Sequence, residues 1–138
     1  MKRLSHIGVA VKDLAVSVPL FKKLLGVKEQ KRETVEDQRV KVAFFRLEGA
    51  SIELTEATAP DSPIASFLSK RGEGVHHLSF EVDDLRSELA RLKSAGIQLI
   101  DEAPRKGAGG HWIAFLHPRS TNGVLIELGD IQRVCVNG

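Results

Sequence analysis

Two histidines and two glutamates are the side chains of this chain most suited to chemistry, because each pair occupies two similar segments. His6 lies in LSHIGVAV, and His77 lies in GVHHLSFEV 71 residues later. Glu53 lies in SIEL, and Glu127 lies in VLIEL 74 residues later. A duplicated strand that carries a duplicated polar residue indicates a site built by internal symmetry.

These four side chains are expected on one face of a sheet. Successive side chains of a strand point to opposite faces, and each of the four segments alternates in this way, as in HIGVAV. One face of each strand is therefore apolar and packs on helices, while the other carries a histidine or a glutamate. If the sheet of each half curls, the four groups converge in a cleft.

Imidazole nitrogen and carboxylate oxygen together favour a divalent first-row metal ion such as Mn, Fe, Co, Ni or Zn. The predicted ligands are His6, Glu53, His77 and Glu127. Four protein ligands on an ion that accepts six would leave two positions for a bidentate substrate. A single strand histidine is more often structural than a ligand, but the repetition of both residue types favours metal binding.

Other polar residues near these strands have simpler interpretations. His76 is expected on the face opposite His77, as a packed histidine at the start of its strand. His111 and His117 flank WIAFL, and His117, which precedes a proline at a strand end, is interpreted as structural or loop-facing. Glu81 shares the face of His77 and is expected in the wall of the cleft.

A basic, glycine-rich loop, PRKGAGGHW at 104–112, could present backbone N–H groups to phosphates, but it fits no phosphate-loop pattern and is equally typical of a flexible hairpin loop. Several basic residues could meet an anionic substrate, although solvated surface charge is the default for each. These are Lys70, Arg71, Arg105, Lys106 and Arg119.

Three helices are expected to position the strands. The spacing of the apolar residues predicts a helix from Asp13, which can cap it, to Gly26, with a kink or a later start at Pro19. A second helix is expected from Ser62 to Gly72. A third covers DDLRSELARLKSAG, in which the leucines form one stripe.

The remaining segments predict a βαβββ unit that is used twice. Strands are expected over HIGVAV, VKEQKRET, RVKVAFFRL and ASIELTEA, and again over HHLSFEV, IQLIDE, HWIAFLH and GVLIEL. The expected fold class is α+β, with two tandem modules forming a curled mixed sheet around a metal cleft. The single domain covers 1–130, as module one (4–57), a connecting helix (61–72) and module two (74–129), and 131–138 form a C-terminal tail.

Composition excludes several classes of protein. The 138 residues suit one domain, and the 42% of hydrophobic residues permits a real core. A net charge of +2 gives no argument for nucleic acid. The single cysteine, Cys135, excludes an internal disulfide framework and favours a reducing, cytoplasmic location. No apolar run reaches the ~20 residues of a membrane helix, and the N-terminus is not expected to be a signal peptide.

The twofold βαβββ pattern resembles the vicinal oxygen chelate superfamily, which includes glyoxalase I, extradiol dioxygenases and fosfomycin resistance proteins. Within it the chain resembles the methylmalonyl-CoA epimerase family over roughly residues 4 to 129. The specific segments are HIGVAVKDL, IELTEATAPDSPIASFLSKRGEGVHHLSFEVDDL, LIDEAPRKGAGG and IAFLHPRSTNGVLIEL.

The resemblance implies a homodimer and a divalent metal, often cobalt, with Mn²⁺, Ni²⁺ or Zn²⁺ also used. The family's metal positions match His6, His77 and Glu127, and the fourth, glutamine in several members, is Glu53 here. The implied reaction interconverts (R)- and (S)-methylmalonyl-CoA at C2. Chelation of the thioester oxygen and the carboxylate stabilises the enolate, while one group removes the proton and another returns it.

One position departs from part of the family. Some members carry a glutamate, proposed as one of the two bases, where this chain has Val42, which cannot move a proton. Because Glu53 is a gained carboxylate, we hypothesise that it is both a ligand and the second catalytic base, opposite Glu127. Glu36, in the loop before the same strand, is the weaker substitute.

Three other functions fit the superfamily. A glyoxalase-type isomerase would need a pocket for a glutathione-like thiol, for which the sequence gives no sign. An Fe(II) dioxygenase uses two histidines and one carboxylate, and Glu53 would crowd the positions that oxygen chemistry needs open. A metal-free binding module typically lacks the four predicted ligands. The epimerase with methylmalonyl-CoA as substrate is therefore preferred.

Overall fold

The computed structural model describes residues 1 and 3–130, so the tail predicted at 131–138 lies outside the described residues. The strands are β1 (Arg3–Ala10), β2 (Lys31–Val35), β3 (Val40–Arg46), β4 (Ser51–Ala57), β5 (Gly74–Val82), β6 (Arg105–Lys106), β7 (Trp112–Leu116) and β8 (Ile126–Asp130). The helices are α1 (Leu14–Leu25), α2 (Pro63–Arg71) and α3 (Leu85–Ser94), with 3₁₀ turns η1 (Glu36–Gln38), η2 (Ala108–Gly110) and η3 (Pro118–Ser120).

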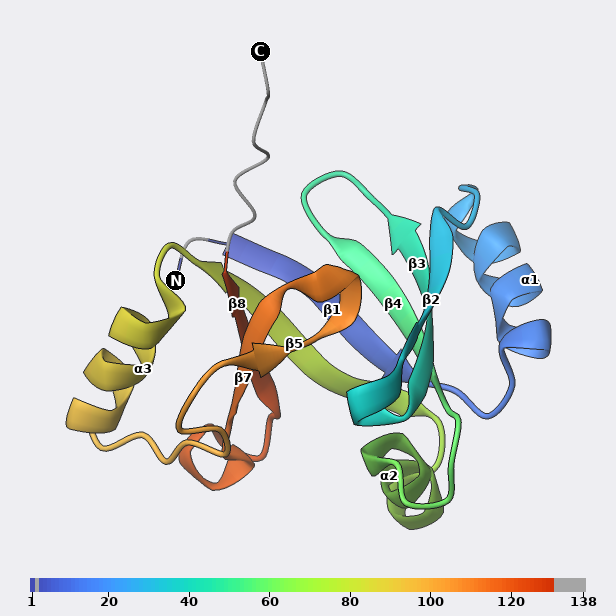
Figure 1. Cartoon of the computed structure of the whole chain (residues 1–138). Coiled ribbons are helices and arrows are strands. Elements are labelled where there is room, and N and C mark those ends of the chain that lie inside the picture. Colours follow the sequence, from blue (N-terminus) through green and yellow to red (C-terminus); the bar gives the residue numbers. More distant parts are fainter. Residues whose placement is uncertain (2, 131–138) are drawn as a thin grey trace.

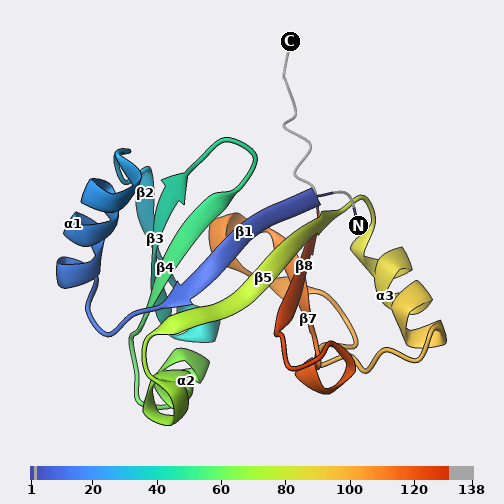
Figure 2. The same cartoon turned by 180° about the vertical axis from the view of Figure 1, so that it is seen from behind.

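All eight described strands belong to one mixed sheet, in the order β2-β3-β4-β1-β5-β8-β7-β6. β1 runs parallel to β4, β5 runs parallel to β8, and β1 and β5 pair antiparallel at the centre. The sheet curls strongly, with α1 and α3 on its outer side at opposite ends (Figure 1). From behind, β1 and β5 cross the middle side by side (Figure 2). The predicted curled α+β fold is confirmed.

Three apolar clusters hold the sheet in this curve. One lies between α1 and the first half of the sheet and is centred on Phe45 and Leu54. A second lies between α3 and the second half, around Leu89 and Leu128. The third contains Phe44 and Ile64 and lies on the inner side of β3, where α2 covers it. α2 thus closes one end of the space inside the curve.

The helix ends follow the sequence signals. The Asp13 carboxylate accepts a hydrogen bond from Ala15 N, and Gly26 ends α1 in the left-handed conformation. α1 starts directly after Asp13, so the later start considered for Pro19 is wrong. The burial of Leu14 and Val18 against the sheet offsets the hydrogen bond that Pro19 removes.

The strand predicted over IQLIDE is also wrong. Within it, Leu99 makes an isolated bridge to Leu116, and the short edge strand comes later, at β6. The Asp101 carboxylate explains the difference, because its Oδ2 accepts the hydrogen bond from Phe115 N, 2.8 Å away, that a strand carbonyl would otherwise take.

The two edges of the sheet approach each other across the concave side. Both carboxylate oxygens of Glu33, on β2, accept from the backbone N–H of Gly109, at 2.9 and 2.8 Å. Gly109 belongs to η2, which follows β6, and its φ of 68° suits glycine. The curled sheet is therefore joined at its open side by this contact.

Candidate active site

Three of the four predicted ligands meet at one point on the concave side of the sheet. His6 Nε2 lies 3.1 Å from His77 Nε2 and 3.1 Å from Glu127 Oε2. His77 Nε2 lies 3.4 Å from the same Glu127 oxygen. These three atoms form a group that could hold a metal ion. Histidines and a carboxylate from opposite halves of the chain are thus brought together.

The sheet register explains how these residues meet. His6 on β1 lies opposite Ser79 on β5, and Ser79 lies opposite Glu127 on β8. The second row runs from His77 through Gly8 to Glu53 on β4. Each row therefore has a small residue between its histidine and its glutamate. Gly8 and Ser79 match in the internal repeat, a signal in the sequence whose meaning only the register reveals.

Glu53 occupies a different place from the other three. Its Oε2 lies 2.7 Å from Nδ1 of His6, the ring nitrogen that faces away from the group of three atoms. The side chain is buried, with 8% of the residue exposed. Glu53 therefore contacts a predicted ligand from behind, and its own ligation of the metal stays a prediction.

The charges at this point are strongly coupled. Burial lowers the pKa of His6, but its contacts with Glu127 and Glu53 outweigh burial and raise that pKa to about 10. Burial likewise raises the pKa of Glu127, yet the contacts with His6 and His77 hold it well below its usual range. A protonated His6 between two carboxylates is the state that these contacts favour without a metal ion.

The donor set fits a divalent cation. Glu127 Oε2 is buried and meets no donor in hydrogen-bonding geometry among the described residues, although two ring nitrogens lie within 3.4 Å of it. Ligand atoms bound at ~2.1 Å to one tetrahedral or octahedral ion lie roughly 3.0–3.4 Å apart. The three atoms already have this spacing, so His6, His77 and Glu127 suit a first-row metal ion.

His76 is on the cavity side, which corrects the prediction that it faces away from His77. The pairing of β1 with β5 shifts by one residue between Gly8 and Val9, and His76 is the extra residue. Such a β-bulge re-aims the side chain that it carries. Burial, followed by the charge of His77, lowers the pKa of His76 to about 4. No residue pattern in this segment predicts the bulge.

The group of three atoms lies in a cavity of about 750 Å³, which is the size of a small-molecule site. Val42, Phe44 and Ile64 line it from the first half of the chain, and Ile113 and Phe115 line it from the second. The polar cluster thus lies next to apolar side chains from both halves of the chain, within a cavity whose lining also includes charged residues.

The other predicted polar residues divide between the cavity and the surface. Glu81 and His111 line the cavity, as does Arg105, whose Cζ lies 5.4 Å from the centre of the Phe115 ring. His117 accepts from Arg119 N at the start of η3, which confirms its structural role. Glu36 lies outside this cavity lining, in a shallow neighbouring depression.

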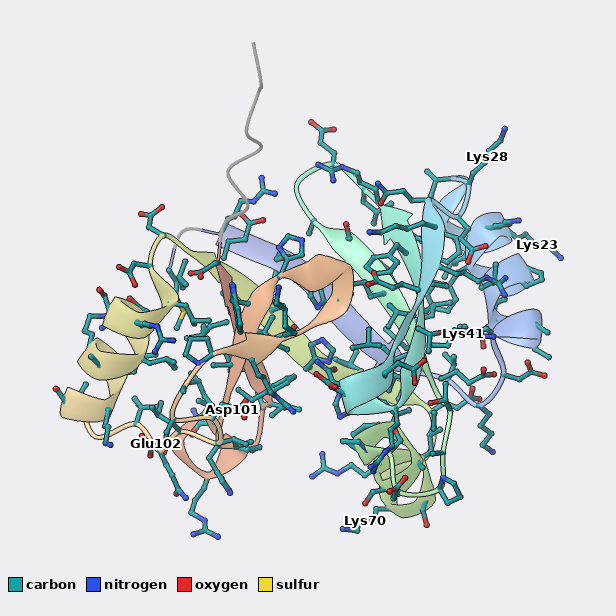
Figure 3. All side chains as sticks on the ribbon, viewed as in Figure 1. Lys23, Lys28, Lys41, Lys70, Asp101 and Glu102 are labelled. Atoms are coloured by element: carbon teal, nitrogen blue, oxygen red, sulfur yellow. The ribbon has the colours of Figure 1, made fainter. Side chains whose placement is uncertain are left out.

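Most of the predicted basic contacts lie elsewhere. Lys70 extends from the outer side of α2, away from the concave side of the sheet (Figure 3). Arg71, Lys106 and Arg119 also lie outside the cavity lining, whereas three basic residues that were not predicted belong to it. These are Arg3, Lys31 and Arg46. The curl of the sheet brings these three side chains to the cavity. The residues next to them in the sequence do not show that they would line it.

A model of the Glyoxalase/Bleomycin resistance protein/Dioxygenase superfamily matches residues 5–115. The chain is 37% identical over 131 residues to the ethylmalonyl-CoA/methylmalonyl-CoA epimerase of Cereibacter sphaeroides, covering 94% of this chain and 98% of the relative. The chain belongs to the methylmalonyl-CoA epimerase family of this superfamily. It is also 45% identical to the uncharacterised protein YqjC of Bacillus subtilis, over 93% of this chain and 91% of that protein.

Solved structures similar to this chain agree with the fold. A hypothetical protein from Bacillus halodurans has a TM-score of 0.94 at 38% identity, with 98% of each chain covered. The methylmalonyl-CoA epimerase of Mycobacterium tuberculosis has a TM-score of 0.89 at 37% identity, with 94% of this chain and 88% of that chain covered. A variant of the Streptomyces coelicolor epimerase, in complex with 2-nitronate-propionyl-CoA, has a TM-score of 0.92 at 34% identity and covers 97% of each chain.

No helix among residues 1 and 3–130 combines the length and the apolar character that crossing a membrane requires.

Proposed function

We propose that this chain is a methylmalonyl-CoA epimerase, which interconverts the (R) and (S) forms of its substrate by proton transfer at C2. One observation carries the proposal: two histidines and a carboxylate from both halves of the chain converge within 3.4 Å of one another in a cavity large enough for an acyl thioester. The family of its relatives supplies the substrate class.

His6, His77 and Glu127 are the residues that would hold the metal ion. A divalent cation, when bound, supplies positive charge next to the oxygens on which the enolate charge develops. The identity of the metal is part of the proposal, with cobalt preferred. Arg105, whose guanidinium lies over the ring of Phe115 in the cavity lining, is the basic residue from the predicted set that could meet the carboxylate of the substrate.

Glu53 and Glu127 are proposed as the two proton-transfer groups. They contact opposite ring nitrogens of His6, at 2.7 and 3.1 Å, so His6 separates two carboxylates that could serve the two faces of C2. Val42 forms part of the apolar wall and offers no proton. Both carboxylates are buried beside the site, where positioned groups could remove and return the proton.

The apolar residues that line the cavity are proposed to control the access of water. Phe44, Phe115 and Val42 line the cavity, and we propose that they limit the water beside C2 and so protect a carbanion-like intermediate from unselective protonation. Positioned carboxylates then decide which face of C2 receives the proton.

The proposal extends to the biological setting. We propose that the enzyme is a cytoplasmic homodimer that serves propionate metabolism. Sedimentation of the purified chain would test the dimer, since a mass near 15.1 kDa would contradict it.

Solvent deuterium incorporation at C2 of methylmalonyl-CoA tests the function directly. The measurement compares metal-stripped protein with protein reloaded with Co²⁺. Rapid, metal-dependent exchange with loss of stereochemistry is expected. Exchange no faster than background, with the metal bound, would refute the proposed substrate.

A further inference from the structure

The β-bulge in β5 gives His76 a position that ordinary strand alternation would not. Neighbouring residues of a regular strand point to opposite faces. At the bulge, Gly8 pairs with His77 while Val9 pairs with Val75, which leaves His76 unpaired between them. His76 and His77 consequently lie in contact, with their rings perpendicular at 89° and their centres 5.2 Å apart.

The contact between the two rings is polar. Nδ1 of His76 lies 3.0 Å from Nδ1 of His77, while Nε2 of His77 faces His6 and Glu127. Among the described residues, no other side chain makes a hydrogen bond to Nδ1 of His77. The other side of the His76 ring packs edge-on against Phe67 of α2, with ring centres 5.0 Å apart. His76 is thus held by α2 while it touches a predicted ligand.

The chemistry of a metal-bound imidazole decides which of the two rings donates the hydrogen bond and which accepts it. A ring nitrogen that binds a metal ion carries no proton, so the other nitrogen carries it and needs an acceptor. We propose that His76 is a positioning residue, whose Nδ1 accepts the Nδ1–H of His77 and so fixes the tautomer and orientation in which His77 Nε2 faces the metal site. This inference rests on the metal site of the proposed function.

The first half of the chain repeats the arrangement. The pairing of β1 with β5 also shifts between Leu4 and His6, where Ser5 is the extra residue. The Ser5 hydroxyl oxygen lies 3.2 Å from Nδ1 of His6, and Glu53 Oε2 lies 2.7 Å from the same atom. Each histidine of the site is therefore preceded by a bulge residue that contacts its outward-facing nitrogen. Two independent bulges with the same outcome indicate a feature of the site and not a local irregularity.

Two substitutions of His76 separate its hydrogen bond from its packing. His76→Phe keeps a ring against Phe67 but removes the acceptor, and His76→Gln keeps a side-chain oxygen that can accept. His111→Phe is the matched control, since His111 lines the same cavity without a contact to His77. The affinity of each full-length protein for Zn²⁺ is measured by competition with a chelator.

We expect His76→Phe to weaken Zn²⁺ binding about 10–100-fold, the usual effect of removing the hydrogen-bond partner of a metal ligand. His76→Gln should stay within about threefold of the wild type, and His111→Phe should leave the affinity unchanged. Wild-type affinity in His76→Phe would overturn the inference and leave the proposed function intact. A wild-type protein that binds no Zn²⁺ would overturn the metal site of the proposed function itself.

A measurement on the wild type avoids any effect of substitution on folding. In the ¹⁵N NMR spectrum of the Zn²⁺-loaded protein, His76 should be the tautomer with its proton on Nε2 and a free lone pair on Nδ1. A proton on Nδ1 of His76 would overturn the inference, because that nitrogen could then not accept from His77. A packing role alone would favour neither tautomer.

Discussion

The space that a side chain at position 8 would need is filled by the ring of His77. A Cβ built on Gly8 would lie 2.6 Å from Nε2 of His77, and closer still to two other atoms of the ring. Gly8 pairs directly with His77 in the β1–β5 register, and the imidazole occupies the space next to the Gly8 Cα where a Cβ would lie. Glycine is required here for the space it leaves, since its backbone is that of an ordinary strand.

Gly8→Ala should therefore displace His77. We expect a loss of about 1–3 kcal/mol in the free energy of unfolding from overpacking, and a loss of at least tenfold in Zn²⁺ affinity. Urea unfolding and chelator competition measure the two effects. Gly129→Ala is the control, since its Cβ would meet its nearest neighbours at 3.9 Å, an ordinary contact. If both variants bind Zn²⁺ equally well, the result would contradict the close approach of the His77 ring to Gly8.

Glu53→Gln tests the second proton-transfer group. The amide keeps the size of the side chain but cannot accept a proton, so we expect kcat for epimerisation to fall about 10²–10⁴-fold with the metal still bound. Activity and metal content are measured on the same preparation. A variant that keeps its metal and full turnover would show that Glu53 transfers no proton.

The double variant Val42→Glu, Glu53→Gln moves the carboxylate to the position at which some members of the family are expected to carry a glutamate. Val42 lines the cavity, so a glutamate there can reach the same space. We expect part of the lost turnover to return relative to Glu53→Gln alone. Val42→Glu without the second change tests whether an added carboxylate is sufficient to alter the rate.

Metal binding should release a proton. Contacts with Glu127 and Glu53 overcome burial and raise the pKa of His6 to about 10 in the metal-free protein, above its unfolded value near 6.5. His6 is therefore protonated at pH 7, and its Nε2 must lose a proton to bind a metal. Zn²⁺ affinity should rise with pH by up to about tenfold per unit between pH 7 and 9. Calorimetry in two buffers of different ionisation heat counts the proton, and zero release would contradict the raised pKa.

The apolar cluster between α1 and the first half of the sheet should carry much of the stability of that half. Phe45 is fully buried (0% exposed), and its ring centre lies 6.3 Å from that of Phe21 on α1. Phe45→Ala should cost about 3–5 kcal/mol in the free energy of unfolding, through lost burial and a cavity. Val16→Ala on the outer side of α1, where Val16 is 68% exposed, should change it by less than about 0.5 kcal/mol. Denaturant unfolding of the two variants compares them, and equal losses would contradict the packing of α1.

The sequence indicated the parts of the fold that depend on local signals. The Asp13, Ser62 and Gly26 positions predicted helix ends because capping involves residues within one turn. The repeat of histidine and glutamate predicted which strands meet at the site. The strand predicted over 97–102 from its residue pattern is absent, because the side chain of Asp101 accepts the hydrogen bond of Phe115 N that a strand carbonyl would otherwise accept.

The arrangement within the site could not be predicted in the same way. Alternation places His76 opposite His77, but alternation assumes a regular strand, and the bulge is a property of the pairing between β1 and β5. Likewise, Glu53 is on the predicted face, yet the two ring nitrogens of His6 separate it from Glu127. Distances of a few ångströms depend on register and ring orientation, which residue types do not determine.

The pairing of β1 with β5 at the centre of the sheet also makes metal binding depend on the correct assembly of the two halves of the chain. His6 comes from one side of the β1–β5 pairing, and His77 and Glu127 come from the other. A chain that is cut between β4 and α2 would leave no fragment with all three atoms. Metal capture would then begin only when the two pieces had recombined with β1 and β5 in register, and the bound ion would mark the correctly joined molecule.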